Sequence, residues 1–175
     1  LIGLASIAAA IKYTMGKSPY GYSGFGDLFV FVFFGLVGVI GSYFMFSKSY
    51  TSNTLYLAIS IGLLSTGVLN INNIRDIKSD FKAGKISIPV RLGAHYAALY
   101  HLVLVVGAMV SAVLFNVNNE LTSPLNLLYV LSFPLLGYNC YKIATLTPCQ
   151  MNPYLKQLAL SSFAFSLLMA ISINL

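Results

Sequence analysis

The chain has 175 residues, of which 58% are hydrophobic and only 8% are charged, whereas soluble domains usually contain about 25% charged residues. This composition excludes an ordinary soluble domain, which could not bury so much apolar surface. The formal net charge of +6 does not indicate a nucleic-acid partner, because the basic residues lie between apolar runs, as they do in loops at a membrane surface. We therefore expect an all-α, polytopic transmembrane helix bundle in contact with membrane lipid.

Apolar runs long enough to cross a bilayer, about 20 residues each, occupy most of the chain. The first eleven residues are apolar but too short to span, and we interpret them as the end of a helix. Five spans of a single transmembrane domain are expected after them, at residues 28–46, 55–71, 96–117, 121–143 and 155–175. Pro134 predicts a kink in the fourth of these, because proline lacks a backbone N–H and clashes with the preceding turn.

The distribution of lysine and arginine predicts the orientation, since these residues favour the cytoplasmic side of a membrane. Nine of the ten basic residues lie in or beside alternate loops, at residues 12–26, 72–91 and 142–155, and only Lys48 lies on the other side. We expect these three loops on the cytoplasmic face and the C-terminus on the opposite face. The expected location is a bacterial inner membrane.

The segment 72–91 carries the residues best suited to chemistry. Asp76 and Asp80 are four residues apart, so on a helix continuing from the preceding span their carboxylates project from one face, with Asn72 one turn earlier. Hard oxygen ligands of this kind suit Mg²⁺, which usually takes one or two carboxylates together with water and substrate phosphates. The spacing therefore indicates a site for Mg²⁺ and a diphosphate.

Basic residues surround these two carboxylates and give the segment a net charge of +3, as five bases against two acids: Arg75, Lys78, Lys82, Lys85 and Arg91. Guanidinium and ammonium groups would neutralise the oxygens of a diphosphate and favour its departure. The alternative is a basic loop on a solvated helix, whose acids merely pair with neighbouring lysines. The spacing of the two aspartates does not by itself exclude that alternative.

A longer pattern surrounds the two aspartates. The string Asn73-x-Arg75-Asp76-x-x-x-Asp80-x-x-x-Gly84-Lys85, ending in Val90-Arg91-Leu92-Gly93, resembles the second aspartate-rich motif of the UbiA superfamily of intramembrane aromatic prenyltransferases. On the same expected side, Tyr13-Thr14-Met15-Gly16-Lys17 resembles the family's YxxxK element. The glycine-rich stretch at residues 19–30, with Phe33-Phe34-Gly35 after it, is similar to the branch that prenylates 1,4-dihydroxy-2-naphthoate in menaquinone synthesis.

The resemblance implies a reaction and a partial site. The reaction is Mg²⁺-dependent transfer of a polyprenyl group from its diphosphate to 1,4-dihydroxy-2-naphthoate with loss of CO₂, giving demethylmenaquinone; another aromatic acceptor is the alternative. The family's first aspartate-rich motif, NDxxDxxxD, is absent from this sequence, where Asp27 and Glu120 are the only other acids. We therefore expect the segment to be inactive alone.

Roles follow from the resemblance residue by residue. It implies that Asp76 and Asp80 are metal ligands assisted by Asn72 or Asn73. It implies that a second set of residues contacts or approaches the diphosphate, namely Arg75, Lys85, Arg91, Lys17 and Tyr13. For the basic residues the alternative is a surface position, and for the tyrosine it is the aromatic belt at the membrane interface.

Several other residues keep two interpretations. Phenylalanines in the first span line a tunnel for the isoprenoid tail or simply pack between helices, namely Phe31, Phe33, Phe34 and Phe44. We expect His95 and His101 to cap a helix or lie at the interface, and Cys140 and Cys149 match no metal-ligand spacing. A non-catalytic transporter or lipid-binding protein stays open as the rival class, although the spans contain almost no ionisable residues of the kind that transporters use.

Overall fold

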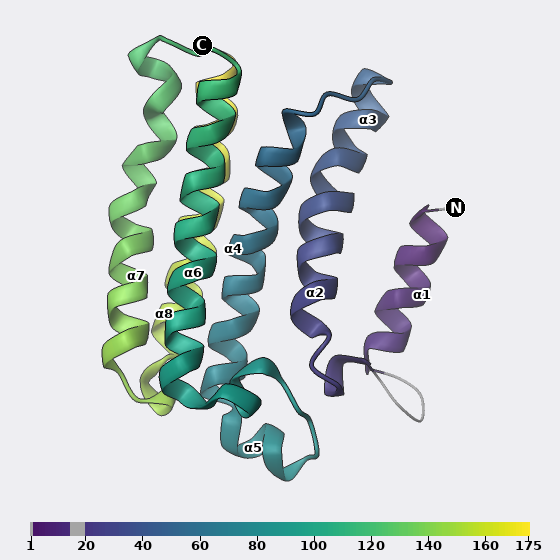
Figure 1. The fold of residues 1–175 in the computed structure, drawn as a ribbon, viewed down its shortest axis with the longest axis vertical. Coiled ribbons are helices and arrows are strands. Elements are labelled where there is room, and N and C mark those ends of the chain that lie inside the picture. Colours follow the sequence, from purple (N-terminus) through teal and green to yellow (C-terminus); the bar gives the residue numbers. More distant parts are fainter. Residues whose placement is uncertain (1, 15–19) are drawn as a thin grey trace.

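The computed structural model describes residues 2–14 and 20–175, and every regular element within them is helical. In chain order they are α1 (Ile2–Thr14), η1 (Tyr20–Tyr22), α2 (Gly26–Val30), η2 (Phe31–Ile40), α3 (Gly41–Ser47), α4 (Thr54–Arg75), α5 (Ile77–Lys82), α6 (Ile88–Asn118), η3 (Pro124–Ser132), α7 (Phe133–Thr145), η4 (Pro148–Gln150) and α8 (Asn152–Ile173). The predicted all-α class is confirmed. Figure 1 shows the long helices side by side as an up-and-down bundle.

Four helices within the described residues are long and apolar enough to cross a membrane: Gly26–Ser47, which joins α2, η2 and α3, and then α4, α6 and α8. The region expected as the span 121–143 is instead built from two pieces, η3 and α7, which meet at Ser132 and Phe133. Pro134 lies in the first turn of α7, where its missing N–H breaks no helical hydrogen bond. Pro134 therefore lies where the 3-10 helix η3 gives way to the α-helix α7.

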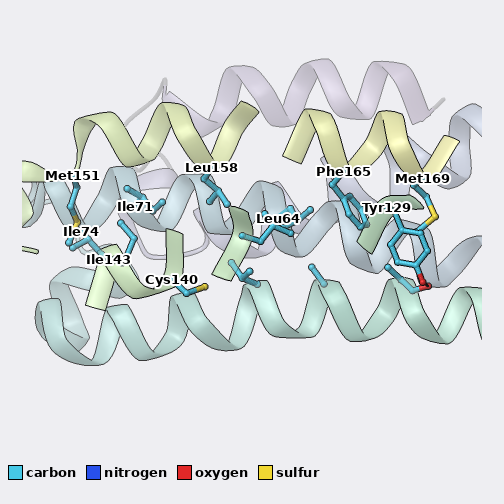
Figure 2. Packing of buried hydrophobic residues seen from close by; sticks show 14 of the residues in the cluster. Leu64, Ile71, Ile74, Tyr129, Cys140, Ile143, Met151, Leu158, Phe165 and Met169 are labelled. Atoms are coloured by element: carbon cyan, nitrogen blue, oxygen red, sulfur yellow. The ribbon is translucent and has the colours of Figure 1, made fainter. Parts of the chain in front are cut away.

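Helix α4 lies at the centre of the bundle and packs against η2, α6 and α8. Its residues Leu64, Ile71 and Ile74 are almost completely buried, because apolar side chains of the neighbouring helices, including α6 and α8, pack around them. Figure 2 shows this core, in which Leu158 and Phe165 of α8 face α4 along its length. Packing of the apolar part of α4 therefore determines where its charged C-terminal end lies.

A polar network crosses the same core. His101 of α6 is fully buried, and its Nε2 lies 3.0 Å from Oδ1 of Asn139 on α7. The amide of Asn139 donates in turn to the Tyr154 carbonyl and to Gln157 of α8. The expectation that His101 caps a helix or lies at the interface is therefore wrong, because its ring is buried inside the bundle and its polar partner lies on another helix.

The connections gather at two ends of the bundle (Figure 1). The end of α1, the start of α2, the α5 segment and the α7–α8 connection lie at one end, while the α3–α4 and α6–η3 connections and the C-terminus lie at the other. Most of the basic residues lie in or beside the first set of connections, so we call that end of the bundle the basic end. Within the described residues, the helix ends that border the three segments placed on one face by the sequence do lie together at this end.

The close approach of η2 to α4 depends on glycine. A Cβ on Gly35 would lie 2.5 Å from the Ala58 carbonyl oxygen and 2.7 Å from Cα of Gly62, well inside van der Waals contact. Gly62 is just as confined, because a Cβ there would meet the Phe31 ring at 2.8 Å. Small residues at such a crossing let two helix backbones touch.

We expect Gly35→Ala to destabilise the bundle by about 1–3 kcal/mol, since the added methyl must push η2 away from α4. The matched control is Gly41→Ala, because no heavy atom lies within 4 Å of a Cβ at Gly41. Thermal unfolding in detergent should show a lower midpoint for Gly35→Ala and an unchanged or slightly higher one for Gly41→Ala. Equal midpoints would contradict the packing at this crossing.

Candidate active site

The charged segment at the basic end begins where α4 stops. Asp76 leaves helical geometry at φ −98° and ψ 9°, and α5 then continues for six residues. The expected uninterrupted helix is therefore broken at Asp76, although the Asp80 amide still donates to the Asp76 carbonyl at 2.8 Å. The two aspartates keep the one-turn spacing that the sequence predicted.

Glycine then reverses the chain toward α6. Gly84 has φ +72° and Gly93 has φ +78°, a backbone conformation that favours glycine over residues with a Cβ. Between them Ser87 precedes the start of α6, with Pro89 in its first turn, a position where proline is well tolerated. The turn at Gly84 brings Lys85 back to Asn73 near the end of α4, whereas Gly93 lies within α6 and marks a kink in that helix.

Asp76 belongs to a network centred on Arg75. The guanidinium holds both carboxylate oxygens, with Nη2 2.6 Å from Oδ2 and Nε 2.7 Å from Oδ1. It also donates to Oδ1 of Asn72 at 2.7 Å and to Oδ1 of Asn152, at the start of α8, at 2.9 Å. The hydrogen bond from Arg75 holds the pKa of the Asp76 carboxyl below its usual range. Asp76 is therefore a carboxylate at neutral pH.

Asp80 belongs to a second network, centred on Lys85. The Lys85 ammonium lies 2.7 Å from Oδ2 of Asp80 and donates to Oδ1 of Asn73 at 2.9 Å. Only 15% of the Asp80 side chain and 19% of the Lys85 side chain are exposed, and Asn73 is buried. Asn72 and Asn73 are adjacent in the sequence but belong to different networks, because successive side chains of a helix point about 100° apart.

The glycine-rich stretch before α2 lies against the same segment. The Ile86 amide donates to the Tyr22 carbonyl at 2.8 Å, and the Arg91 guanidinium donates to the Ser23 carbonyl at 3.0 Å. Gly24 has φ +86°, and a Cβ there would lie 2.9 Å from the Ile86 carbonyl oxygen. Two stretches far apart in the sequence, each singled out by its pattern, therefore meet at one place.

The predicted site residues divide into three groups in the structure. Asn72, Asn73, Arg75, Lys85 and the two aspartates form the two networks described above. Arg91 joins neither ion pair, and Lys78 and Lys82 are exposed. The backbone of Tyr13 lies in α1, but its side chain and the whole of Lys17 lie outside the described residues.

The donor atoms of the two networks suit a hard cation. A carboxylate has about four lone-pair sites, so the oxygens of Asp76 and Asp80 that already accept from Arg75 or Lys85 can still bind a metal ion. Within the described residues, no three His, Cys, Asp or Glu side chains cluster closely enough to hold a metal ion by themselves. The set fits a Mg²⁺ that takes its other ligands from substrate phosphates and water.

An apolar groove of about 480 Å³ leads away from the first network. It runs between η2, α4 and α8, and its lining includes Val30, Phe34, Val68, Leu69, Asn72 and Ala159. Asn72 links the groove with the charged segment, because its side-chain oxygen accepts a hydrogen bond from Arg75. The groove thus joins a polar end to an apolar body.

The four candidate tunnel phenylalanines behave differently from one another. Phe34 lines the groove and is 63% exposed. Phe31 packs against Gly62, Phe33 stacks on Phe29 with ring centroids 6.0 Å apart, and Phe44 is exposed. Of the four, Phe34 alone is among the residues lining this groove.

Two features were missed by sequence reasoning. Asn152 completes the Arg75 network from the far end of the chain, and no sequence pattern marked it. Asp27 at the start of α2 is only 5% exposed and accepts from the Tyr100 hydroxyl at 3.2 Å. A signal for Asp27 existed, because an acid beside a long apolar run costs free energy unless it is paired or functional.

Comparisons with known proteins identify the family of this chain. The model of the UbiA prenyltransferase family matches residues 1–167. A 1,4-dihydroxy-2-naphthoate octaprenyltransferase of Haemophilus influenzae is 41% identical over 98% of this chain and 56% of its own length. The Escherichia coli protein of the same name is 40% identical over 100% of this chain and 57% of its own length.

A further relative, the 1,4-dihydroxy-2-naphthoate octaprenyltransferase of Mycobacterium tuberculosis, is 45% identical over 65% of this chain and 39% of its own length. No solved structure matches the chain. The chain spans 56–57% of the length of the two relatives that it matches along nearly its whole length. The family match and the four apolar helices establish that this chain is an integral membrane protein and belongs to the UbiA prenyltransferase family.

Proposed function

We propose that the full-length protein transfers a polyprenyl group from its diphosphate to 1,4-dihydroxy-2-naphthoate, with Mg²⁺ bound at Asp76 and Asp80. The observation that carries the proposal is that each aspartate pairs with a cation that also binds an asparagine, and that one of these asparagines, Asn72, lines an apolar groove. The names of three relatives support the choice of acceptor. Other aromatic acceptors are the alternative.

The residues of this chain would act mainly by electrostatics. Bound Mg²⁺ would supply positive charge to the diphosphate as it leaves. Arg75 and Lys85 already lie against the metal-ligand candidates, so their positive charge would be in place near the diphosphate oxygens before negative charge develops there. Asn72 and Asn73 hold these two cations in place. The site is thereby arranged before the substrate arrives, which lowers the reorganisation that the reaction requires.

The reaction proposed here conserves atoms and electrons. The allylic C–O bond breaks and the diphosphate leaves with its electron pair, while a ring carbon of the acceptor supplies the pair for the new C–C bond. The acceptor carboxylate then departs as CO₂ and returns its bonding pair to the ring. The product is the reduced form of demethylmenaquinone. The groove would hold the isoprenoid tail and exclude water from the allylic centre.

Location and sidedness form part of the proposal. We infer that the basic end faces the cytoplasm of a bacterial cell, because lysine and arginine concentrate there. The diphosphate and the acceptor would then approach from the cytoplasm, while the tail enters the apolar groove from the membrane.

We expect Asp76→Ala and Asp80→Ala each to lower prenyl transfer by the full-length protein by about 100-fold or more, because a bound metal contributes several kcal/mol of charge stabilisation. The assay uses octaprenyl diphosphate, 1,4-dihydroxy-2-naphthoate and Mg²⁺. Lys78→Ala is the control, since that side chain is exposed and joins neither network. Undiminished activity in either aspartate variant would contradict the assignment of the metal site. Transfer only to 4-hydroxybenzoate would contradict the proposed acceptor.

The groove predicts a separate effect on chain length. Ala159 of α8 lines the groove, so Ala159→Phe fills space that a long tail would use and should raise the KM for octaprenyl diphosphate about tenfold. The KM for geranyl diphosphate should change little. Ala170→Phe, at an exposed position of the same helix, is the control. Equal effects on both substrates would show that the tail does not lie in this groove.

The rival class, a non-catalytic transporter or lipid-binding protein, predicts no prenyl transfer under any of these conditions. The described ionisable groups also speak against a transport path. Asp27 lies at the start of its helix rather than in the middle of the bilayer, and His101 is held by Asn139 inside a packed core. We therefore retain prenyl transfer as the function that the site supports best.

A further inference from the structure

Among the described residues, the Arg75 guanidinium hydrogen-bonds to one long helix besides its own, α8. Its Nε and Nη2 atoms donate to Asp76 and Asn72, and both partners lie within three residues of Arg75 in the sequence. Its Nη1 atom donates to Oδ1 of Asn152 at 2.9 Å, 77 residues further along the chain. Asn152 is therefore the contact that ties this guanidinium to a second helix.

Asn152 lies at a helix start that is held independently of Arg75. The preceding residue, Met151, is 1% exposed and belongs to the apolar core. Two residues after Asn152, the Tyr154 carbonyl accepts a hydrogen bond from the Asn139 amide of α7 at 2.9 Å. A core side chain and a hydrogen bond from another helix thus keep the first turn of α8 in place. Asn152 presents a fixed acceptor to an arginine side chain, which otherwise has many rotamers.

The same contact borders the apolar groove. Leu155, one turn after Asn152, lines that groove. On α4, Asn72 also lines it and lies one turn before Arg75. Residues three apart share a helix face, so Asn152 and Arg75 meet where the groove reaches the charged segment. The start of α8 lies at the basic end (Figure 1). A diphosphate whose tail occupied the groove would lie beside this contact.

Counting the donors of Arg75 leaves one hydrogen for a ligand. A guanidinium has five N–H groups, and four of them are used, two for Asp76, one for Asn72 and one for Asn152. The fifth belongs to Nη1, the atom that Asn152 binds, and none of the described residues accepts from it. Because a guanidinium is planar and rigid, holding one hydrogen of Nη1 also fixes the direction of the other.

From this arrangement we propose that Asn152 is a positioning residue for diphosphate binding. Its side-chain oxygen holds Nη1 of Arg75, so that the remaining N–H is available to a non-bridging oxygen of the diphosphate. This hold does not depend on Asp76, so the guanidinium stays in place when that carboxylate binds Mg²⁺. The amide is neutral and leaves the charge of Arg75 uncancelled. The inference rests on the proposed function, since it requires a prenyl diphosphate beside Asp76.

The experiment measures binding rather than turnover. The full-length protein in detergent is titrated with farnesyl thiodiphosphate, an unreactive analogue, in the presence of Mg²⁺, and Kd is obtained by calorimetry. We expect Asn152→Ala to raise Kd about fivefold, the effect of losing one hydrogen bond. Asn152→Asp keeps the acceptor but pairs Arg75 with a second negative charge, so it should raise Kd about twentyfold.

Matched controls make the same two changes at the other end of α8. The exposed Asn174 side chain donates to the Ala170 carbonyl of its own helix, so Asn174→Ala and Asn174→Asp should leave Kd unchanged.

A second pair of variants tests whether Asn152 acts through Arg75. Lysine keeps the positive charge but lacks the planar fork that reaches Asp76 and Asn152 together, so Arg75→Lys retains binding while losing the contact with Asn152. In that background Asn152→Ala should change Kd by less than about twofold. An equal rise in both backgrounds would overturn the inference, because Asn152 would then act without Arg75.

The outcomes separate this inference from the proposed function. An unchanged Kd in Asn152→Ala would overturn the inference and leave prenyl transfer unaffected. A lower thermal unfolding midpoint in Asn152→Ala than in Asn174→Ala would also overturn it, because a structural defect would then explain the weaker binding. Failure of the unaltered protein to bind the analogue would overturn the diphosphate site itself, and the inference with it.

Discussion

Helix α4 is packed among apolar side chains over most of its length and carries polar and charged side chains in its last turn. The arrangement of the site depends on this combination. The first four turns of α4 are packed from several sides, by η2 across the contact of Gly35 with Gly62 and by α6 and α8 elsewhere. Its last turn carries two asparagines and an arginine beside the first aspartate. A helix held this tightly cannot rotate, since its side chains interdigitate with those of three neighbours. The directions of Asn72, Asn73 and Arg75 are therefore set by apolar packing that lies well away from the charges.

Ion pairs at the basic end have a different role from packing. The Arg75 and Asp76 side chains are 27% and 31% exposed, and pairs with that much solvent contact contribute little to stability, roughly 0–1 kcal/mol. Their value in the proposed reaction lies in position. The alternative interpretation of the sequence was that the acids pair with nearby bases. The structure does contain such pairs, Arg75 with Asp76 and Lys85 with Asp80. The buried asparagine behind Lys85 and the groove beside Asn72 distinguish this arrangement from a merely solvated loop.

Polar groups inside the spans follow the rule that burial requires partners. Asn139 accepts from or donates to groups on α6 and α8, and so links three helices through amide and imidazole atoms. Such contacts hold helices in register where apolar packing alone permits sliding. The groove beside α4 lies on the outer side of this packed core, with a polar end at Asn72 and an apolar body.

The sequence by itself determined the helical class, the approximate positions of four of the five expected apolar helices and the identity of the charged segment. These properties are local: hydrophobic run length, the spacing of Asp76 and Asp80, and the glycines that end the segment are all visible within a few turns of chain. The same local patterns did not reveal that α4 breaks at Asp76 or that the region 121–143 divides at Ser132. Both depend on how a helix end is held by its surroundings.

Only the tertiary structure decided which partners the charged residues take. Asn152 reaches Arg75 from 77 residues away, and His101 is buried because Asn139 comes to it from another helix. The sequence treated Phe31, Phe33, Phe34 and Phe44 as equivalent, yet their surroundings differ because each points to a different neighbour. A sequence specifies which residues share a helix face, whereas contacts between helices depend on crossing geometry. That geometry is fixed here by close approaches such as Gly35 against Gly62, which no local pattern encodes.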